Sequence, residues 1–224
     1  MNKLRLRFTK TGRAIYISHL DLLHTIQRSF SRAGLPLAHS EGFNPHPATS
    51  IALPLSLGHE SMCEILDFKL VPEFSSELSN ITDSLNNALP DGIEVIEIYE
   101  PIRKIKELKY LKVLGLLEFD SKIIDCSLLA DFFSKNEIII SKRSKKGPVD
   151  FDIKKAIKDL YFTNFSSAGL SSTVELCAVI SAQDPTLNPE LLIDAIKQYI
   201  PECSPDFDKF KRIEVFDENM KVFR

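Results

Sequence analysis

The sequence predicts an α+β protein with antiparallel sheets and helices on one face of each sheet. Segments in which apolar and polar residues alternate, the period of a half-buried strand, occur throughout the chain. Amphipathic segments of helical length separate them. The first half reads strand, helix, strand, strand, helix, strand, which is the ferredoxin-like order. We therefore expect two ferredoxin-like (βαββαβ) halves in tandem, as domains 1–102 and 108–224, joined by a charged linker that follows Pro101.

The first half begins with an alternating segment, 3–9, that predicts a strand with one buried face. Ser18 and Asp21 form a capping-box-like start for a helix that ends at Ala33, before Gly34. The face of this helix toward the core is expected to carry Leu20, Leu22, Leu23, Ile26, Phe30 and Ala33. The remaining elements are a short strand at 35–39, a long connection over 39–61, a strand at 63–70, a helix at 75–89 and a strand at 93–99.

The second half repeats this pattern in element order alone, without sequence similarity to the first. Pro189 falls in the first turn of an expected helix, a position that proline favours. The expected elements are strands at 110–119, 137–142, 174–180 and 212–216, helices at 127–133 and 188–200, and one further strand or helix within 153–162.

Composition excludes few partners, because the net charge is only −3 and hydrophobic residues make up 44%. Charge is nevertheless polarised: residues 1–62 hold seven bases against three acids, and residues 63–100 hold one base against nine acids. No apolar run approaches the roughly 20 residues that a membrane helix needs. The four cysteines are dispersed and include no Cys-x-x-Cys pair, so we expect reduced thiols and a cytoplasmic protein without a membrane partner.

All five histidines lie between His19 and His59, a clustering that indicates either a site or structural use. Asp21, His24 and Arg28 are helical neighbours on the face away from the core. They form either a binding surface or a solvated face. His19 lies in the first turn on the core side, where it is either a buried, hydrogen-bonded residue or the floor of a cleft.

The segment from Ser40 to Pro47 is a second candidate. Two prolines fix the backbone on either side of His46, so a side chain held there loses little entropy on binding. Asn44 and His46 in so stiff a loop favour ligand positioning over core packing, although a structural turn remains open. His19, His46 and Asp21 match no known metal motif, and we expect no metal.

A basic segment at 141–148 is the third candidate. It places Lys142, Arg143, Lys145 and Lys146 in a hairpin-like loop, where they could neutralise phosphates. No aromatic residue interrupts it, which argues against base stacking there. A charged loop tip without a ligand is the alternative.

Several motifs are missing. The sequence has no phosphate-binding Gly-x-x-x-x-Gly-Lys-Ser/Thr loop, no Gly-x-Gly-x-x-Gly and no Gly-x-Ser-x-Gly elbow. We therefore expect no cofactor, and nothing supports an enzyme built around a nucleophile.

The segments 5–23, 32–47 (with Gly42-Phe43-Asn44-Pro45-His46-Pro47) and 52–58 resemble the radical SAM-linked protein family, as do 146–150 and 187–190. That is a bacterial family of unknown function, found beside or fused to cobalamin-binding radical SAM proteins. The resemblance implies a radical SAM protein as partner. Because this chain lacks the three-cysteine cluster motif, it is similar to the accessory module and not to the catalyst. Genes of that family often lie near ones for ribosomal proteins and an RNase, which implies RNA or a ribosomal component as a further partner.

Two functions follow as expectations. In the first, a non-catalytic accessory presents RNA or a ribosome-related substrate to the radical SAM partner. Its binding residues would be Arg5, Arg7, Arg13, Ser18, Asp21, Arg28, Asn44, Lys142, Arg143, Lys145 and Lys146. In the second, the chain is a metal-independent RNA-processing enzyme in which His19, His46 and Tyr16 supply acid–base catalysis. Arg13 would then stabilise the transition state. The second requires His19 and His46 to share one cleft.

Overall fold

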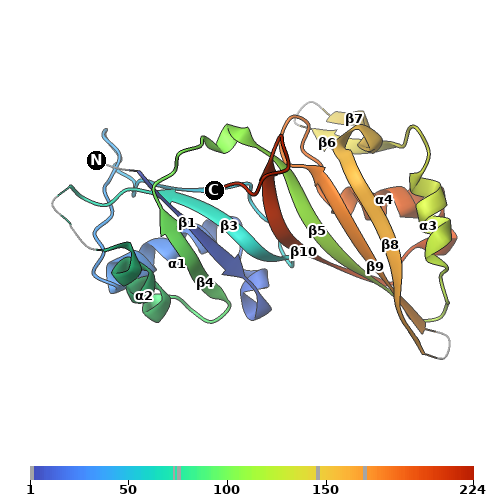
Figure 1. Ribbon diagram of the computed structural model, residues 1–224, viewed down its shortest axis with the longest axis horizontal. Helices are drawn as coiled ribbons and strands as arrows, with labels where there is room; N and C mark the ends of the chain where they lie inside the picture. Colours follow the sequence, from blue (N-terminus) through green and yellow to red (C-terminus); the bar gives the residue numbers. More distant parts are fainter. Residues whose placement is uncertain (1–2, 73, 75–76, 145–146, 169–170) are drawn as a thin grey trace. The chain divides into compact units, whose positions relative to one another are not determined.

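The computed structural model describes residues 3–72, 74, 77–144, 147–168 and 171–224, with only the backbone at 142–144 and 166–168. The chain divides into two compact units, Met1–Ile105 with Arg224 and Lys106–Phe223. Each unit combines antiparallel strands with α-helices (Figure 1). The α+β class predicted from the sequence is confirmed.

The first unit contains four strands and two α-helices among the residues that the structure describes. Their order is β1 (Leu4–Lys10), a 3-10 turn η1 (Gly12–Tyr16), α1 (His19–Arg32), β2 (Thr49–Ala52), β3 (Glu60–Phe68), α2 (Leu78–Ala88) and β4 (Ile93–Tyr99). The strands pair antiparallel in the order β4-β1-β3-β2. The first strand therefore lies in the interior of the sheet.

Both helices of this unit contribute to one core with the sheet. Leu4, Leu6 and Phe8 alternate along β1 and share a cluster with Ile26 of α1 and Leu85 of α2. The predicted cap of α1 is present: the Ser18 side chain accepts a hydrogen bond from the Asp21 amide, and Gly34 follows the helix with a φ of 69°.

Four expectations for the first unit are wrong. Residues 35–39 form no strand and make only isolated bridges, because Pro36 offers no amide hydrogen. The second strand is β2, inside the expected long connection. Every residue of β1 is buried, on both faces of the sheet. Leu20, assigned to the core face, is exposed, since the buried face of α1 begins at Leu22.

The second unit contains β5 (Leu108–Phe119), α3 (Cys126–Phe133), β6 (Ile139–Ser144), β7 (Gly147–Asp152), β8 (Ile157–Ala168), β9 (Ser171–Ser181), α4 (Glu190–Tyr199) and β10 (Phe207–Asp217). Short 3-10 turns occupy Ile105–Glu107, Ile153–Ala156 and Pro201–Cys203. Strands pair antiparallel in the order β10-β5-β9-β8, and β6 and β7 form a separate hairpin. Apart from that hairpin, this unit has the element order and strand order of the first.

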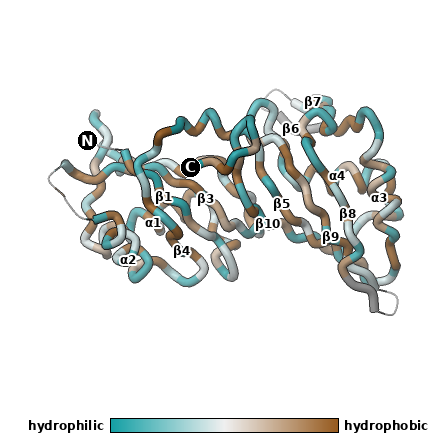
Figure 2. Tube along the Cα trace, in the orientation of Figure 1, coloured by the Kyte–Doolittle hydropathy of each residue, from teal (hydrophilic) through white to brown (hydrophobic). Residues whose placement is uncertain are grey.

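In the second unit, α4 lies behind β8 and β9, and α3 lies beside β8 (Figure 1). Buried positions alternate with partly buried ones along most of β5, and Figure 2 shows this strand in the hydropathy colours. Leu129 of α3, Leu192 of α4 and Leu176 of β9 are fully buried there. The strand β7 was not expected, because Pro148 and the charged residues around it give no strand pattern.

Candidate binding site

The loop between Ser40 and His46 in the first unit closes on itself. The Ser40 amide donates to the His46 carbonyl at 2.8 Å, and the His46 amide donates to the Ser40 hydroxyl at 3.0 Å. Behind this closure, His39 bridges to Pro47 and the Ala48 amide donates to the Ala38 carbonyl. The proline-braced segment therefore forms a small hairpin-like projection with a fixed base.

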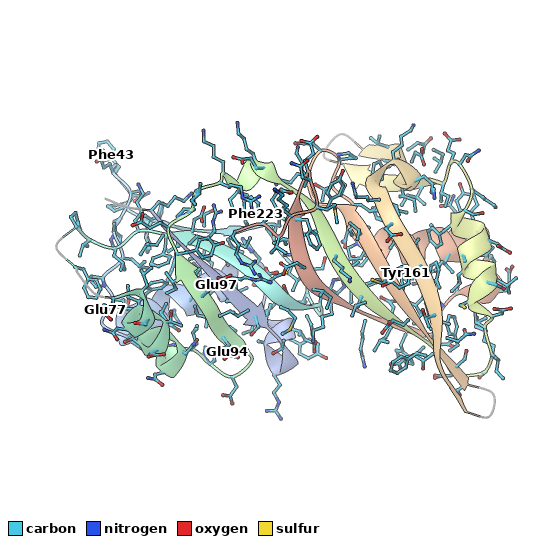
Figure 3. All side chains as sticks on the ribbon, viewed as in Figure 1. Phe43, Glu77, Glu94, Glu97, Tyr161 and Phe223 are labelled. Carbon is cyan, nitrogen blue, oxygen red and sulfur yellow. The ribbon has the colours of Figure 1, made fainter. Side chains whose placement is uncertain are left out.

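Phe43 occupies the tip of this projection and is fully exposed, with a relative accessibility of 107%. Figure 3 shows it at the far end of the loop, directed away from the sheet. Its neighbours from Glu41 to His46 are also exposed. A fully exposed phenyl ring contributes no buried apolar area to folding. Its exposure on a braced loop therefore indicates a role in binding.

A depression of about 390 Å³ lies at the base of the loop. Its size falls within the range of about 300–1,000 Å³ that is typical of small-molecule sites. It contains polar and charged side chains from the loop and from β2 and β3. The lining residues are Lys3, Ser40, His46, Pro47, Ala48, Thr49, Ser50, Asp67, Phe68 and Lys69.

The charge of this depression is positive. The carboxylate of Asp67 is bound by Arg5, from Nε at 2.6 Å and from Nη2 at 3.2 Å, and by Lys3 Nζ at 2.5 Å. Lys69, which directly follows β3, is exposed. The charged residues that line the depression are Lys3, Lys69 and Asp67, which leaves a net charge of +1.

Two residues expected to bind phosphate are instead internal. Arg5 is 1% exposed and uses its guanidinium on Asp67 and on the Arg103 carbonyl. Arg7 is also buried, with Nη1 at 4.0 Å from Glu97. Both guanidinium groups are near buried or partly buried carboxylates, because a buried ionised group is stable only beside an opposite charge. The alternating pattern of 3–9 could not reveal this, since it predicted one exposed face.

The other expected binding residues divide into three groups. Arg13, Arg28 and Asn44 are exposed. Ser18 and Asp21 bond to each other at 2.7 Å and cap α1, so their polar atoms already have a structural use. The side chains of Lys142 and Arg143, and the whole of Lys145 and Lys146, lie outside the residues that the structure describes.

The candidate acid–base residues do not converge. Lys10, at the end of β1, donates to the carbonyls of Ile15 and Ile17, so Tyr16 and His19 follow that end of the strand. The loop with His46 joins β2, whose Thr49 pairs with Phe68, and Phe68 pairs with Leu4 at the opposite end. The two ends of this seven-residue strand are separated by about 20 Å. The expectation that His19 and His46 share one cleft is therefore wrong.

Sequence reasoning missed Phe43, Lys3, Lys69 and Ser50 as members of the site. Phe43 had a usable signal, because it is an aromatic residue in a loop of polar residues, glycine and proline. The lysines had none, since Lys3 and Lys69 are brought together only by the pairing of β1 with β3.

Metal binding, thiol chemistry and membrane insertion are the remaining possibilities among the described residues. No group of three or more His, Cys, Asp or Glu side chains there could hold a metal ion. The four cysteines are thiols without a disulfide bridge, and burial raises the pKa of Cys203. Across the same residues, no helix has the length and apolarity needed to cross a bilayer.

Comparison with solved structures finds distant likenesses. A chain in the crystal structure of a Cbf5–Nop10–Gar1 complex is 9% identical, with a TM-score of 0.49, covering 96% of this chain and 50% of that one. The present chain thus spans half the length of that match. A chain described as a glycine cleavage system transcriptional repressor is 14% identical, with a TM-score of 0.25, covering 94% of this chain and 98% of that one.

Comparison with curated proteins finds no match. A family model described as an uncharacterized protein conserved in bacteria, DUF2344, matches residues 3–189. This match includes residues 3–105 of the first unit and most of the second. The chain belongs to the bacterial DUF2344 family.

Proposed function

We propose that this chain is a non-catalytic accessory of a radical SAM system that binds RNA, or an RNA-containing ribosomal component, and presents it to a radical SAM partner. The observation that carries the RNA part is the pairing of a fully exposed Phe43 with a depression of net positive charge at the base of its loop. Aromatic rings beside cations are the usual means of binding single-stranded RNA.

The loop closure supports this use of Phe43. Because Ser40 and His46 bond to each other at its base, the ring is held outside the protein before any ligand arrives. A pre-organised ring loses less entropy when a base stacks on it. Arg28 on α1 is also exposed, and its charge could attract further phosphates of the RNA.

The separation of His19 from His46 supports an accessory over the RNA-processing enzyme. Acid–base cleavage of RNA needs both groups within hydrogen-bond reach of one substrate. The two histidines follow opposite ends of β1, which are about 20 Å apart, and this separation argues against such a pair.

A protein partner is supported by the end of the sheet opposite the loop. Tyr16, Leu20 and Leu57 are 72%, 64% and 61% exposed. Their segments are tied together, because the Gly58 amide donates to the Ile15 carbonyl at 3.0 Å. Exposed apolar side chains grouped in this way are typical of protein interfaces. The radical SAM identity of the partner rests on the resemblance of the first sixty residues.

We further propose that the two units are ferredoxin-like domains with boundaries near 1–102 and 108–224. Support comes from the strand orders β4-β1-β3-β2 and β10-β5-β9-β8, each with two helices in the ferredoxin-like positions. The β6–β7 hairpin is an insertion in the second domain on this view.

RNA binding is tested by titrating single-stranded RNA into the full chain over a salt series. We expect affinity to fall as salt rises, and Phe43→Ala to weaken binding by about 5- to 100-fold, the range for loss of one stacked base. Phe207→Ala, at an exposed phenylalanine of the second unit, is the matched control and should bind as the parent does. No binding at low salt would overturn the RNA proposal.

The partner is tested by purifying the tagged chain from native cells and identifying what accompanies it. We expect a radical SAM protein with the parent chain, and much less of it with the double variant Leu20→Ser and Leu57→Ser. Recovery of RNA without any radical SAM protein would refute the accessory role and leave the RNA role standing.

A further inference from the structure

The depression beside the Phe43 loop has the chemistry of a phosphate site. Asp67 does not repel an anion there, because Arg5 and Lys3 already neutralise its carboxylate. Lys69, the residue after β3, is exposed and also lines the depression. An anion entering the depression therefore meets excess positive charge on a concave surface, where a cation is worth more than on a flat one.

Hydrogen-bond groups in the lining suit a phosphate. Lys3 and Lys69 provide ammonium donors, and Ser50 provides an exposed hydroxyl from β2. The ring of His46 adds a further polar contact on the loop side. A phosphate has enough oxygen atoms to meet several such groups together, and ammonium groups are established phosphate binders.

The position of Phe43 extends this site beyond phosphate. Phe43 lies three residues before His46, so their backbones are at most about 10 Å apart. A ligand held by phosphate in the depression can therefore place an attached ring system against the phenyl face. Stacking on phenylalanine is open to every base, because each base has a π-face.

We propose that the depression and the Phe43 loop form a binding site for one nucleotide of single-stranded RNA. The phosphate contacts Lys3, Lys69 and His46, and the base stacks on Phe43. This site rests on the proposed RNA function, whose substrate class it narrows to an unpaired nucleotide carrying a phosphate.

Titration of the full chain with adenosine monophosphate, adenosine and inorganic phosphate tests the site by calorimetry. We expect the monophosphate to bind more tightly than either half alone. Lys69→Gln should weaken monophosphate and phosphate binding by about tenfold, the effect of losing one charged hydrogen bond. Phe43→Ala should weaken monophosphate binding and leave phosphate binding unchanged.

Matched controls are Lys197→Gln and Phe207→Ala, which change an exposed lysine and an exposed phenylalanine of the second unit. Both should bind the monophosphate as the parent does. Equal binding of the monophosphate by the parent, Lys69→Gln and Phe43→Ala chains would overturn the site, as would a parent that binds none of the three probes.

RNA titration with Lys69→Gln separates the site from the broader function. If RNA binds the parent and the Lys69→Gln chain equally, RNA binding stands and the nucleotide site fails. If the monophosphate binds with the expected variant effects but RNA does not bind, the site stands and the RNA function fails.

Discussion

Arg5 on β1 donates two hydrogen bonds to Asp67 on β3, and the two residues are directly opposite each other in the strand register. Both side chains are buried. The pair thus joins two central strands through a charged contact in the interior and also sets the charge at the floor of the depression. Removal of one partner would leave the other charge buried without its main counter-ion.

We expect Asp67→Asn to lower the free energy of unfolding by about 3–5 kcal/mol, the cost of breaking a buried pair from one side. Urea unfolding followed by circular dichroism measures it. The double change Arg5→Met with Asp67→Leu should restore much of the loss, because it removes both charges. A single Asp67→Asn change of less than about 0.5 kcal/mol would show that the pair adds little to stability.

Lys10 gives the protein a pH dependence of known sign. Burial lowers the pKa of Lys10 below its ordinary value of 10.5, while the nearby Glu64 opposes this shift. Between the lowered pKa and 10.5, the unfolded chain holds more protons than the folded one. Stability contributed by Lys10 therefore rises with pH through that window.

Unfolding measured by urea from about pH 7 to about pH 9.5 tests this sign. That range ends below the pH at which Tyr99 loses its proton, because burial raises the pKa of Tyr99 above 10.0. At higher pH, the stability that Tyr99 contributes would fall. We expect the upward slope in the parent to exceed that of Lys10→Met, or of Lys10→Arg if the first does not fold. Parallel slopes in parent and variants would contradict the assignment.

Gly92 faces a close backbone contact that no side chain could share. Its φ is +87°, and an added Cβ would lie 2.3 Å from the Thr11 carbonyl oxygen. We expect Gly92→Ala to destabilise the protein by about 2–4 kcal/mol through strain and overlap together. Gly34→Ala is the control, since Gly34 also has a positive φ but no atom lies near its Cβ. Its cost should be only about 1–2 kcal/mol, and equal losses at both sites would contradict the steric account.

Ser40 is expected to act as a positioning residue for Phe43. Ser40→Ala removes the acceptor for the His46 amide and loosens the loop base. We expect stability to change by less than about 1 kcal/mol, because the loop is exposed. Affinity for single-stranded RNA should fall several-fold, while Ser40→Thr, which keeps the hydroxyl, should retain it. Retained affinity in Ser40→Ala would contradict the positioning role of the Ser40 hydroxyl.

Much of the fold could be predicted from periodicity. The strand 93–99 has its observed bounds, and α1 begins after the predicted Ser18 cap. Both features are local in sequence, since strand alternation and capping depend on residues a few positions apart. The strand β2 was missed because four residues are too few to show a period, and the apolar run before it suggested a strand at 35–39 instead.

The candidate site could be predicted only in part. The proline-braced loop was recognised from its own residues, but the depression beside it depends on Lys3, Asp67 and Lys69, which the sheet assembles from distant segments. Arg5 and Arg7 were expected on the surface, because no sequence pattern distinguishes a buried arginine in a strand from an exposed one. The predicted meeting of His19 and His46 failed for the same reason, since strand direction decides which end each joins.

The closure between Ser40 and His46 also separates two kinds of constraint on the chain. The residues that flank the closure are bonded to each other and to the sheet, whereas those within it are exposed, so only a binding partner restricts their side chains. Substitutions from Glu41 to Pro45 can thus alter recognition while the scaffold stays intact. Exchange of that short segment between relatives would transfer binding preference without redesign of the rest.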